Sequence, residues 1–147
     1  MSSHVSHEIY LHINWHVKDD RPTLNPEIEP LVHQLIKDRC RRIKGMYFHE
    51  IGGTETHVHL AINIEPFVTI SELLKDLKGG SSHDLNTQLG RKELYWQRGY
   101  GVVSFGKRNL DWVLRYIADQ KEHHAKGRVQ ERLERITGYE DERDADV

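Results

Sequence analysis

Two stretches of nine residues alternate apolar and polar side chains, and no other feature of this sequence restricts the fold so strongly. They cover residues 9–17 (IYLHINWHV) and 56–64 (THVHLAINI). Successive side chains of a β-strand point to opposite faces, so each stretch predicts a strand with one apolar face. In the second stretch that face is wholly apolar and consists of Val58, Leu60, Ile62 and Ile64. We therefore expect residues 56–64 to lie in the middle of a sheet.

A helix and a short strand are predicted between these two stretches. Apolar residues recur at helical spacing over roughly 26–44, and Asn25 would cap the resulting helix. Pro30 would remove a backbone hydrogen bond inside that helix, so a start about four residues later is the alternative. Residues 46–51 then predict a second strand, which ends in a turn at Gly52-Gly53.

The second half of the chain predicts a helix, a strand and a further helix. Thr69 and Glu72 have the spacing of a capping box and open the first of these helices. The stretch Lys-Gly-Gly-Ser-Ser at 78–82 closes it. Residues 95–105 predict a fourth strand with glycine irregularities, and the last core helix covers about 108–124.

The predicted elements follow the order strand, helix, strand, strand, helix, strand, helix. This order predicts an α+β fold, in which a ferredoxin-like antiparallel sheet has helices packed on one face. The other face of the sheet would then be available for a different role. We place one domain at residues 1–126, followed at 127–147 by a charged C-terminal helix and an acidic tail. The tail is too polar to bury anything, so we expect it to be disordered.

Composition excludes some classes of protein and leaves others open. Charged residues make up 30% of the chain, and no apolar run reaches the ~20 residues of a bilayer span, so we expect no membrane partner. The N-terminus lacks the pattern of a secretory signal, and the lone Cys40 cannot form an internal disulfide, which favours a cytoplasmic protein. The formal net charge of -2 gives no overall attraction to nucleic acid. DNA binding would therefore need local basic patches.

His57 and His59 emerge from the polar face of the predicted central strand, about 7 Å apart. Two imidazoles at this spacing can share one metal ion, although a histidine pair on the exposed face of a sheet explains the pattern as well. On the last helix, Tyr116 and Gln120 lie one turn apart at the edge of the apolar stripe, where the helix meets the sheet. They could face the histidines there, or Tyr116 could pack on the rim of the core.

Four short motifs occur in the same order as in a known family. They are Thr-His-Val-His-Leu (56–60), Leu-Lys-Gly-Gly-Ser-Ser (77–82), Trp-Gln-Arg-Gly-Tyr (96–100) and Tyr-Ile-Ala-Asp-Gln (116–120). With these motifs the sequence resembles the single-tyrosine HUH transposases of small bacterial insertion sequences and their relatives associated with repetitive extragenic palindromes. The resemblance covers roughly residues 5–124. The second motif departs from the family's Lys-Gly-Ser-Ser pattern, because Gly80 is inserted.

The resemblance implies an HUH endonuclease-type fold and a metal-dependent transposase that acts on single-stranded DNA with hairpins. By their places in the motifs, His57, His59 and Gln120 would bind Mg²⁺ or Mn²⁺. Tyr116 would be the nucleophile, forming a 5′-phosphotyrosine link and freeing a 3′-hydroxyl. The resemblance also implies a bacterial, cytoplasmic homodimer, in which the tyrosine helix of one subunit completes the metal site of the other.

Basic side chains and further histidines are candidates for supporting roles. The candidates for DNA contact are Arg41, Arg42, Lys78, Arg98, Lys107 and Arg108. The first two could instead offset the negative C-terminal end of the first helix. His12 and His16 share the polar face of the first strand and could lie beside the metal site as bases or as groups that orient its ligands. His123 falls on the same helical flank as Tyr116, whereas His124 is predicted to face solvent.

Two other interpretations of the function stay open. One is a non-mobile descendant that binds structured DNA or RNA without turnover, and the full set of His57, His59, Tyr116 and Gln120 argues against it. The other is a replication initiator or relaxase, which shares the two-histidine motif but usually places its tyrosine differently and needs a longer chain.

Overall fold

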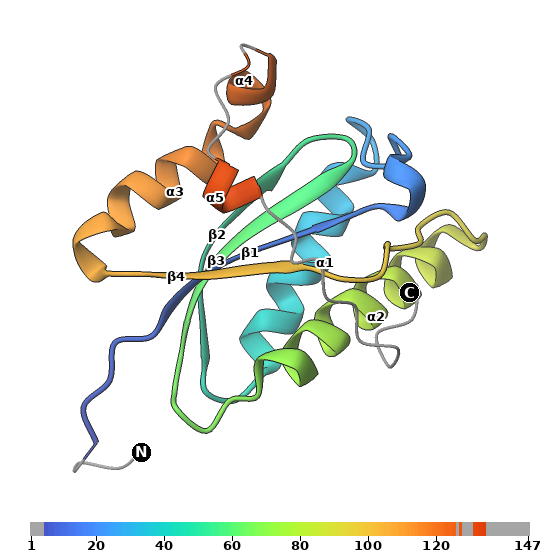
Figure 1. Ribbon diagram of the computed structural model, residues 1–147. Coiled ribbons are helices and arrows are strands. Elements are labelled where there is room, and N and C mark those ends of the chain that lie inside the picture. The colour runs from blue at the N-terminus through green and yellow to red at the C-terminus, as the bar shows by residue number, and fades with distance from the viewer. Residues whose placement is uncertain (1–4, 126, 128–130, 135–147) are drawn as a thin grey trace.

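The computed structural model describes residues 5–125, 127 and 131–134. Its centre is a four-stranded antiparallel sheet with the strand order β2-β3-β1-β4 (Figure 1). The strands are β1 (Tyr10–His16), β2 (Met46–Gly53), β3 (His57–Ile64) and β4 (Gly101–Phe105). A single 3-10 turn, η1 (Lys18–Asp20), follows β1. The α+β ferredoxin-like plan is confirmed, and so is the central place of β3.

Two helices, α1 (Glu29–Arg42) and α2 (Ile70–Leu89), cover one face of the sheet (Figure 1). Buried apolar side chains of both helices meet the apolar face of β3 there and form the main core. α1 begins at the later of its two predicted starts, because Pro30 lies in its first turn. Asn25 closes the turn before it, since its Oδ1 accepts the backbone N–H of Ile28 at 3.0 Å.

α2 is longer than predicted and runs through the Lys-Gly-Gly-Ser-Ser stretch to Leu89. Its apolar stripe continues beyond the two glycines with the buried Leu85. At Gly80 the guanidinium of Arg39 from α1 takes the space of a side chain, since a Cβ there would lie 2.1 Å from Arg39 Cζ. The glycine therefore permits a close contact between helices and does not end one. The helix begins after Thr69 as predicted, although the Thr69 side chain makes no capping hydrogen bond.

Two strand boundaries differ from their predictions. β2 continues through the predicted turn to Gly53, which packs on the backbone of β3, where a Cβ would lie 2.2 Å from the His57 carbonyl oxygen. β4 covers only the last part of the predicted stretch 95–105. Earlier in that stretch, Trp96 makes one isolated bridge to Val17 and is fully buried. Core packing, more than strand pairing, thus holds the segment before β4.

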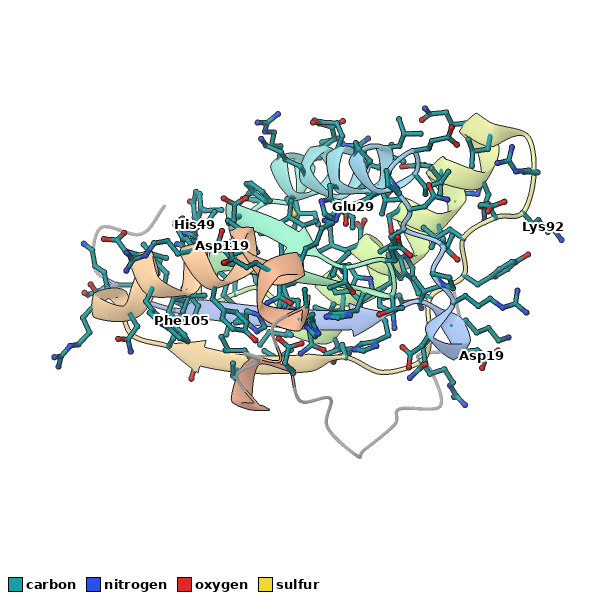
Figure 2. The ribbon with its side chains drawn as sticks, turned by 90° about the horizontal axis from the view of Figure 1, so that it is seen from above. Asp19, Glu29, His49, Lys92, Phe105 and Asp119 are labelled. Carbon is teal, nitrogen blue, oxygen red and sulfur yellow. The ribbon has the colours of Figure 1, made fainter. Side chains whose placement is uncertain are left out.

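The last helices lie on the opposite face of the sheet (Figure 1). They are η2 (Lys107–Asn109), α3 (Leu110–Ala118), α4 (Gln120–Ala125) and α5 (Glu131–Glu134). The prediction of helices on one face therefore holds for α1 and α2 alone. The predicted helix 108–124 is interrupted at Asp119, with φ −99° and ψ 21°, which Figure 2 shows at the joint of α3 and α4. None of the helices in the described part of the chain is long and apolar enough to cross a membrane.

α3 approaches β2 very closely at Gly52. A Cβ on Gly52 would lie 2.2 Å from the carbonyl oxygen of Ile117 and 3.1 Å from its Cγ2. Only a residue without a side chain permits this distance between strand and helix. This contact fixes the distance between α3 and the sheet at Ile117, the residue that follows Tyr116.

The described part of the predicted C-terminal segment folds back onto the sheet. α5 contacts β1 and β4, and its Leu133 is 3% exposed. The carbonyl oxygen of Leu133 accepts a hydrogen bond from Asn14 Nδ2 at 2.7 Å. The acidic tail that we predict to be disordered lies outside the described residues.

Candidate metal and nucleophile site

β3 directs His57 and His59 to the face of the sheet opposite its apolar side chains. Both are buried, with 4% and 0% of their surface exposed, because α3, α4 and α5 lie over this face. Their ring centroids are 5.0 Å apart. An exposed pair on an open sheet is thus excluded as the explanation of the two histidines.

Each of these imidazoles is oriented by a partner at its Nδ1 atom. His57 Nδ1 lies 3.0 Å from the hydroxyls of Thr54 and Thr56, and His59 Nδ1 lies 2.8 Å from His12 Nε2. His16 stacks on His57 with 4.6 Å between centroids, so β1 supplies both predicted neighbours. The Nε2 atoms of His57 and His59 are left to face a common centre. Hydrogen bonds of this kind at the second ring nitrogen fix the orientation of metal-binding histidines in other proteins.

Tyr116 reaches the same centre from α3. Its side chain is 3% exposed, and its ring stands nearly perpendicular to that of His59 at a centroid distance of 6.1 Å. Trp112, one turn earlier, stacks on the other side at 5.6 Å. The phenol and the imidazoles therefore meet within a single chain.

Gln120 and His124 reach the centre from α4. They are four residues apart in one helix, so they point in the same direction. Gln120 is 1% exposed, and its Oε1 has no hydrogen-bond partner among the described residues. His124 does not point into solvent as predicted: its side chain is 31% exposed, and its ring centroid lies 4.8 Å from that of His57. The side chain of His123 lies outside the described residues.

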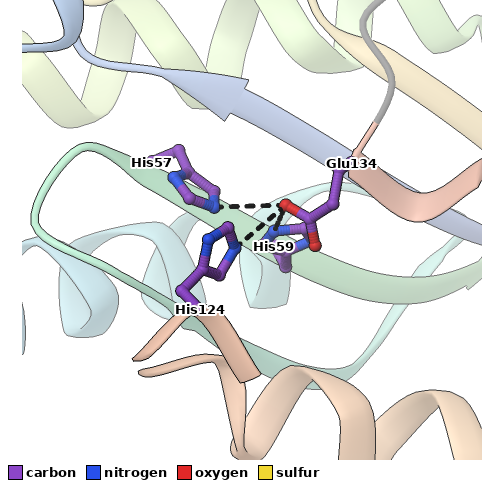
Figure 3. A group of neighbouring side chains, drawn as sticks. All are labelled: His57, His59, His124 and Glu134. Atoms are coloured by element: carbon purple, nitrogen blue, oxygen red, sulfur yellow. Dashed lines mark hydrogen bonds and ion pairs between the residues drawn. The ribbon is translucent and has the colours of Figure 1, made fainter. Parts of the chain in front are cut away.

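Glu134 of α5 completes the cluster and was not predicted. Its Oε1 lies 3.1 Å from Nε2 of His59, 3.1 Å from Nε2 of His124 and 3.4 Å from Nε2 of His57 (Figure 3). Its Oε2 accepts a hydrogen bond from the Tyr116 hydroxyl at 2.5 Å. The sequence offered one signal for this position, the apolar Leu133 among the charged residues of 131–134.

Burial and charge set the ionisation of the site. Burial lowers the pKa of His59 to about 4 and outweighs the opposing effect of Glu134. For Glu134, burial raises the pKa, but the close contacts to His57 and His59 outweigh it and hold the pKa well below its usual range. At neutral pH the site thus pairs a neutral imidazole with a carboxylate, the forms that bind metals. The unpartnered Gln120 Oε1 adds a suitable oxygen donor, so the residues present fit a divalent ion.

Acidification should lower the free energy of unfolding. The unfolded chain protonates His59 near pH 6.5 and the folded chain only near 4, so between these values the unfolded state binds more protons and stability falls as the pH falls. The lowered pKa values of His16 and His33 act in the same direction. Urea unfolding at pH 7, 6 and 5 would measure a loss of at most about 1.4 kcal/mol per pH unit from His59. The slope should be smaller for His59→Gln, and equal stability at pH 7 and 5 would contradict the prediction.

The residues predicted to contact DNA lie in four different settings. Lys78 is fully buried, and its Nζ donates to the carbonyl oxygens of Gln97 and Gly99, so it holds the segment before β4 and does not reach the surface. This corrects its predicted role. Lys107 and Arg108 are exposed at the start of the tyrosine helix, and Arg98 is half-buried. Arg41 and Arg42 are exposed on α1, across the sheet from the histidines.

Comparisons with known proteins identify the family and the relatives of this chain. The family model described as IS200-like transposase matches residues 5–120. The transposases for insertion sequence element IS200 of Salmonella typhimurium LT2 and Salmonella typhi are each 30% identical over 122 residues, covering 79% of both chains.

Two solved structures share the fold. A candidate transposase from Deinococcus radiodurans R1 has a TM-score of 0.65 at 18% identity, covering 82% of this chain and 96% of its own. A tyrosine transposase associated with REP sequences, bound to a REP hairpin, has a TM-score of 0.59 at 13% identity, covering 88% and 76%. By the family model and by its Salmonella relatives, the chain belongs to the IS200-like transposase family.

Proposed function

We propose that this transposase cleaves and rejoins single-stranded DNA at hairpin-marked ends, with Tyr116 as the nucleophile and a divalent ion held by His57 and His59. One observation carries the proposal. A single carboxylate, that of Glu134, meets both the phenol and the imidazoles, at 2.5 Å from Tyr116 Oη and 3.1 Å from His59 Nε2. The site therefore accommodates an anionic group between nucleophile and metal ligands, which is the place that a scissile phosphate would need.

The chemistry of the chain's own groups is a transesterification. The phenol of Tyr116 loses its proton and its oxygen bonds to phosphorus, while the bond from phosphorus to the 3′ oxygen breaks. The departing 3′ oxygen takes up one proton in place of the one that the phenol released, and becomes a free 3′-hydroxyl. The DNA keeps its phosphate in a 5′-phosphotyrosine link. A second 3′-hydroxyl reverses the step, so cleavage and rejoining need no nucleotide triphosphate. The ion would offset the negative charge that develops on the phosphate oxygens.

Gln120 is the proposed third ligand of that ion. Its Oε1 is buried without a hydrogen-bond partner among the described residues, as expected for an atom kept for another ligand. Mg²⁺ and Mn²⁺ remain the proposed ions. Mn²⁺ accepts imidazole nitrogen more readily than Mg²⁺ does, so we expect Mn²⁺ to support cleavage at lower concentration.

The proposed substrate follows from the relatives and from the surface of the chain. One solved relative is bound to a REP hairpin, and the Salmonella relatives are transposases of an insertion sequence. Lys107 and Arg108 are exposed directly before the tyrosine helix and would contact the phosphates of a strand that enters the site. The homodimer stays a prediction. In this conformation one chain alone brings Tyr116 to His59.

A covalent capture experiment tests the proposal. The protein is incubated with labelled single-stranded oligonucleotides from the flanking element ends, with and without their hairpins, in Mn²⁺, Mg²⁺ or EDTA. We expect a metal-dependent adduct that resists denaturant and requires the hairpin. Trypsin should place the nucleotide on the peptide Tyr116–Lys121 (YIADQK), which contains no other tyrosine. Hairpin binding without any adduct in either metal would favour the binding-protein interpretation instead.

A further inference from the structure

We propose that His57, His59, His124 and Glu134 together form a four-ligand site for a transition-metal ion in the DNA-free enzyme. The inference rests on the proposed function only in sharing His57 and His59. His124 and Glu134 come from α4 and α5, and neither belongs to the ligand set implied by the family motifs. The site would take Zn²⁺, Co²⁺ or Mn²⁺ in preference to Mg²⁺.

The positions of the four ligand atoms carry this inference. One nitrogen from each imidazole and one carboxylate oxygen all lie within 4.8 Å of one another. In a tetrahedral site with bonds of about 2.0–2.1 Å, such atoms are roughly 3.3 Å apart. Three nitrogens already converge on Glu134 Oε1 at 3.1–3.4 Å (Figure 3). Small rotations of these side chains are therefore enough to form the site.

The hydrogen bonds behind the ligands suit the same purpose. The threonine hydroxyls at His57 Nδ1 can accept its proton and leave the lone pair on Nε2. The bond between His59 and His12 can be donated from either ring. When His59 Nδ1 donates to His12 Nε2, His59 Nε2 is free to bind a metal; when His12 donates, His59 Nε2 carries the proton that Glu134 accepts. The hydrogen bond between His12 and His59 can thus form both when a metal is bound and when Glu134 accepts the proton of His59 instead.

The donor set also determines which ion would be bound. Three imidazoles and one carboxylate are typical ligands of zinc and its neighbours, whereas Mg²⁺ prefers six oxygens in an octahedron. Four protein ligands leave no place for a phosphate oxygen. Glu134 and the DNA phosphate therefore compete for one coordination position, and the four-ligand site is a resting state that DNA must open.

Optical titration tests the ligand set without any DNA. Metal-free protein is titrated with Co²⁺, whose visible absorption reports tetrahedral coordination, and Zn²⁺ affinity is measured against a chromophoric chelator. We expect Glu134→Gln and His124→Asn each to weaken Zn²⁺ binding at least tenfold and to change the Co²⁺ spectrum. The matched controls Glu72→Gln and His83→Asn alter exposed residues of α2 and should change neither. Circular dichroism of the metal-free variants verifies that each is folded.

The outcomes separate this inference from the proposed function. If His57→Asn lowers Zn²⁺ affinity while the Glu134 and His124 variants bind as the unaltered protein does, the four-ligand site is refuted and the two-histidine site stands. If His57→Asn has no effect either, the metal site of the proposed function fails as well. If the Glu134 and His124 variants lose affinity but no DNA adduct forms in any metal, the four-ligand site stands and the transposition chemistry fails.

Discussion

Replacing Tyr116 with phenylalanine will abolish covalent capture of DNA and lower strand cleavage by roughly four orders of magnitude or more. The change removes one oxygen atom and leaves the ring, so the stacking on Trp112 at 5.6 Å and the contact with His59 at 6.1 Å should persist. The loss would then reflect the missing nucleophile and not a displaced helix. Single-turnover cleavage of the hairpin oligonucleotide, followed on denaturing gels, measures the rate.

The control for this variant is Tyr47→Phe. Tyr47 lies on β2 with half of its surface exposed, and its hydroxyl makes one long hydrogen bond to Glu65 at 3.4 Å. The same deletion of a phenolic oxygen there should leave the cleavage rate unchanged. Cleavage by Tyr116→Phe at more than a few per cent of the normal rate would mean that another group attacks the phosphate.

Gly52→Ala is expected to destabilise the protein and to slow cleavage together. The new Cβ would meet the Ile117 carbonyl oxygen at 2.2 Å, and a backbone atom cannot rotate away. The strand or α3 must shift, at a cost of about 1–3 kcal/mol in the free energy of unfolding. Because Tyr116 precedes Ile117, the shift would also move the phenol away from the imidazoles. Urea unfolding followed by tryptophan fluorescence measures the first effect, and the adduct assay measures the second.

Gly106→Ala is the matched control for Gly52→Ala. It adds the same methyl group before η2, where no atom lies within 4 Å of the new Cβ and the backbone is extended at φ −85° and ψ 155°. Its unfolding free energy and cleavage rate should stay near those of the unaltered protein. Equal free energies of unfolding for the two alanine variants would contradict the prediction, because α3 would then move away from β2 without loss of stability.

The strands of the site were predictable because their pattern is local. A period of two in residues 56–64 determines which side chains share a face, and burial of Val58 and Leu60 then sends His57 and His59 to the other side. Pro30 likewise indicated the later of the two starts that the sequence left open for α1. These conclusions need only a residue and its near neighbours in sequence.

The parts that sequence analysis missed depend on contacts between distant segments. Lys78 is charged, yet it is buried because carbonyl oxygens of a loop 19 and 21 residues away satisfy its ammonium group. Gly80 looked like a helix end, but Arg39 of another helix fills its place. Glu134 lies 75 residues from His59 in the chain, and no local periodicity connects them. Propensity alone contains no information about such partners.

The interruption at Asp119 places Tyr116 in one helix, and Gln120 and His124 in the next. In an unbroken helix Tyr116, Gln120 and His124 would turn as one body, and any tilt that suited the phenol would dictate the position of the other two. With a break between them, a movement of the segment after Asp119 need not displace Ile117, which packs on Gly52 of β2. On the proposed function, the groups that surround the metal could therefore change while the hydroxyl of Tyr116 keeps its position.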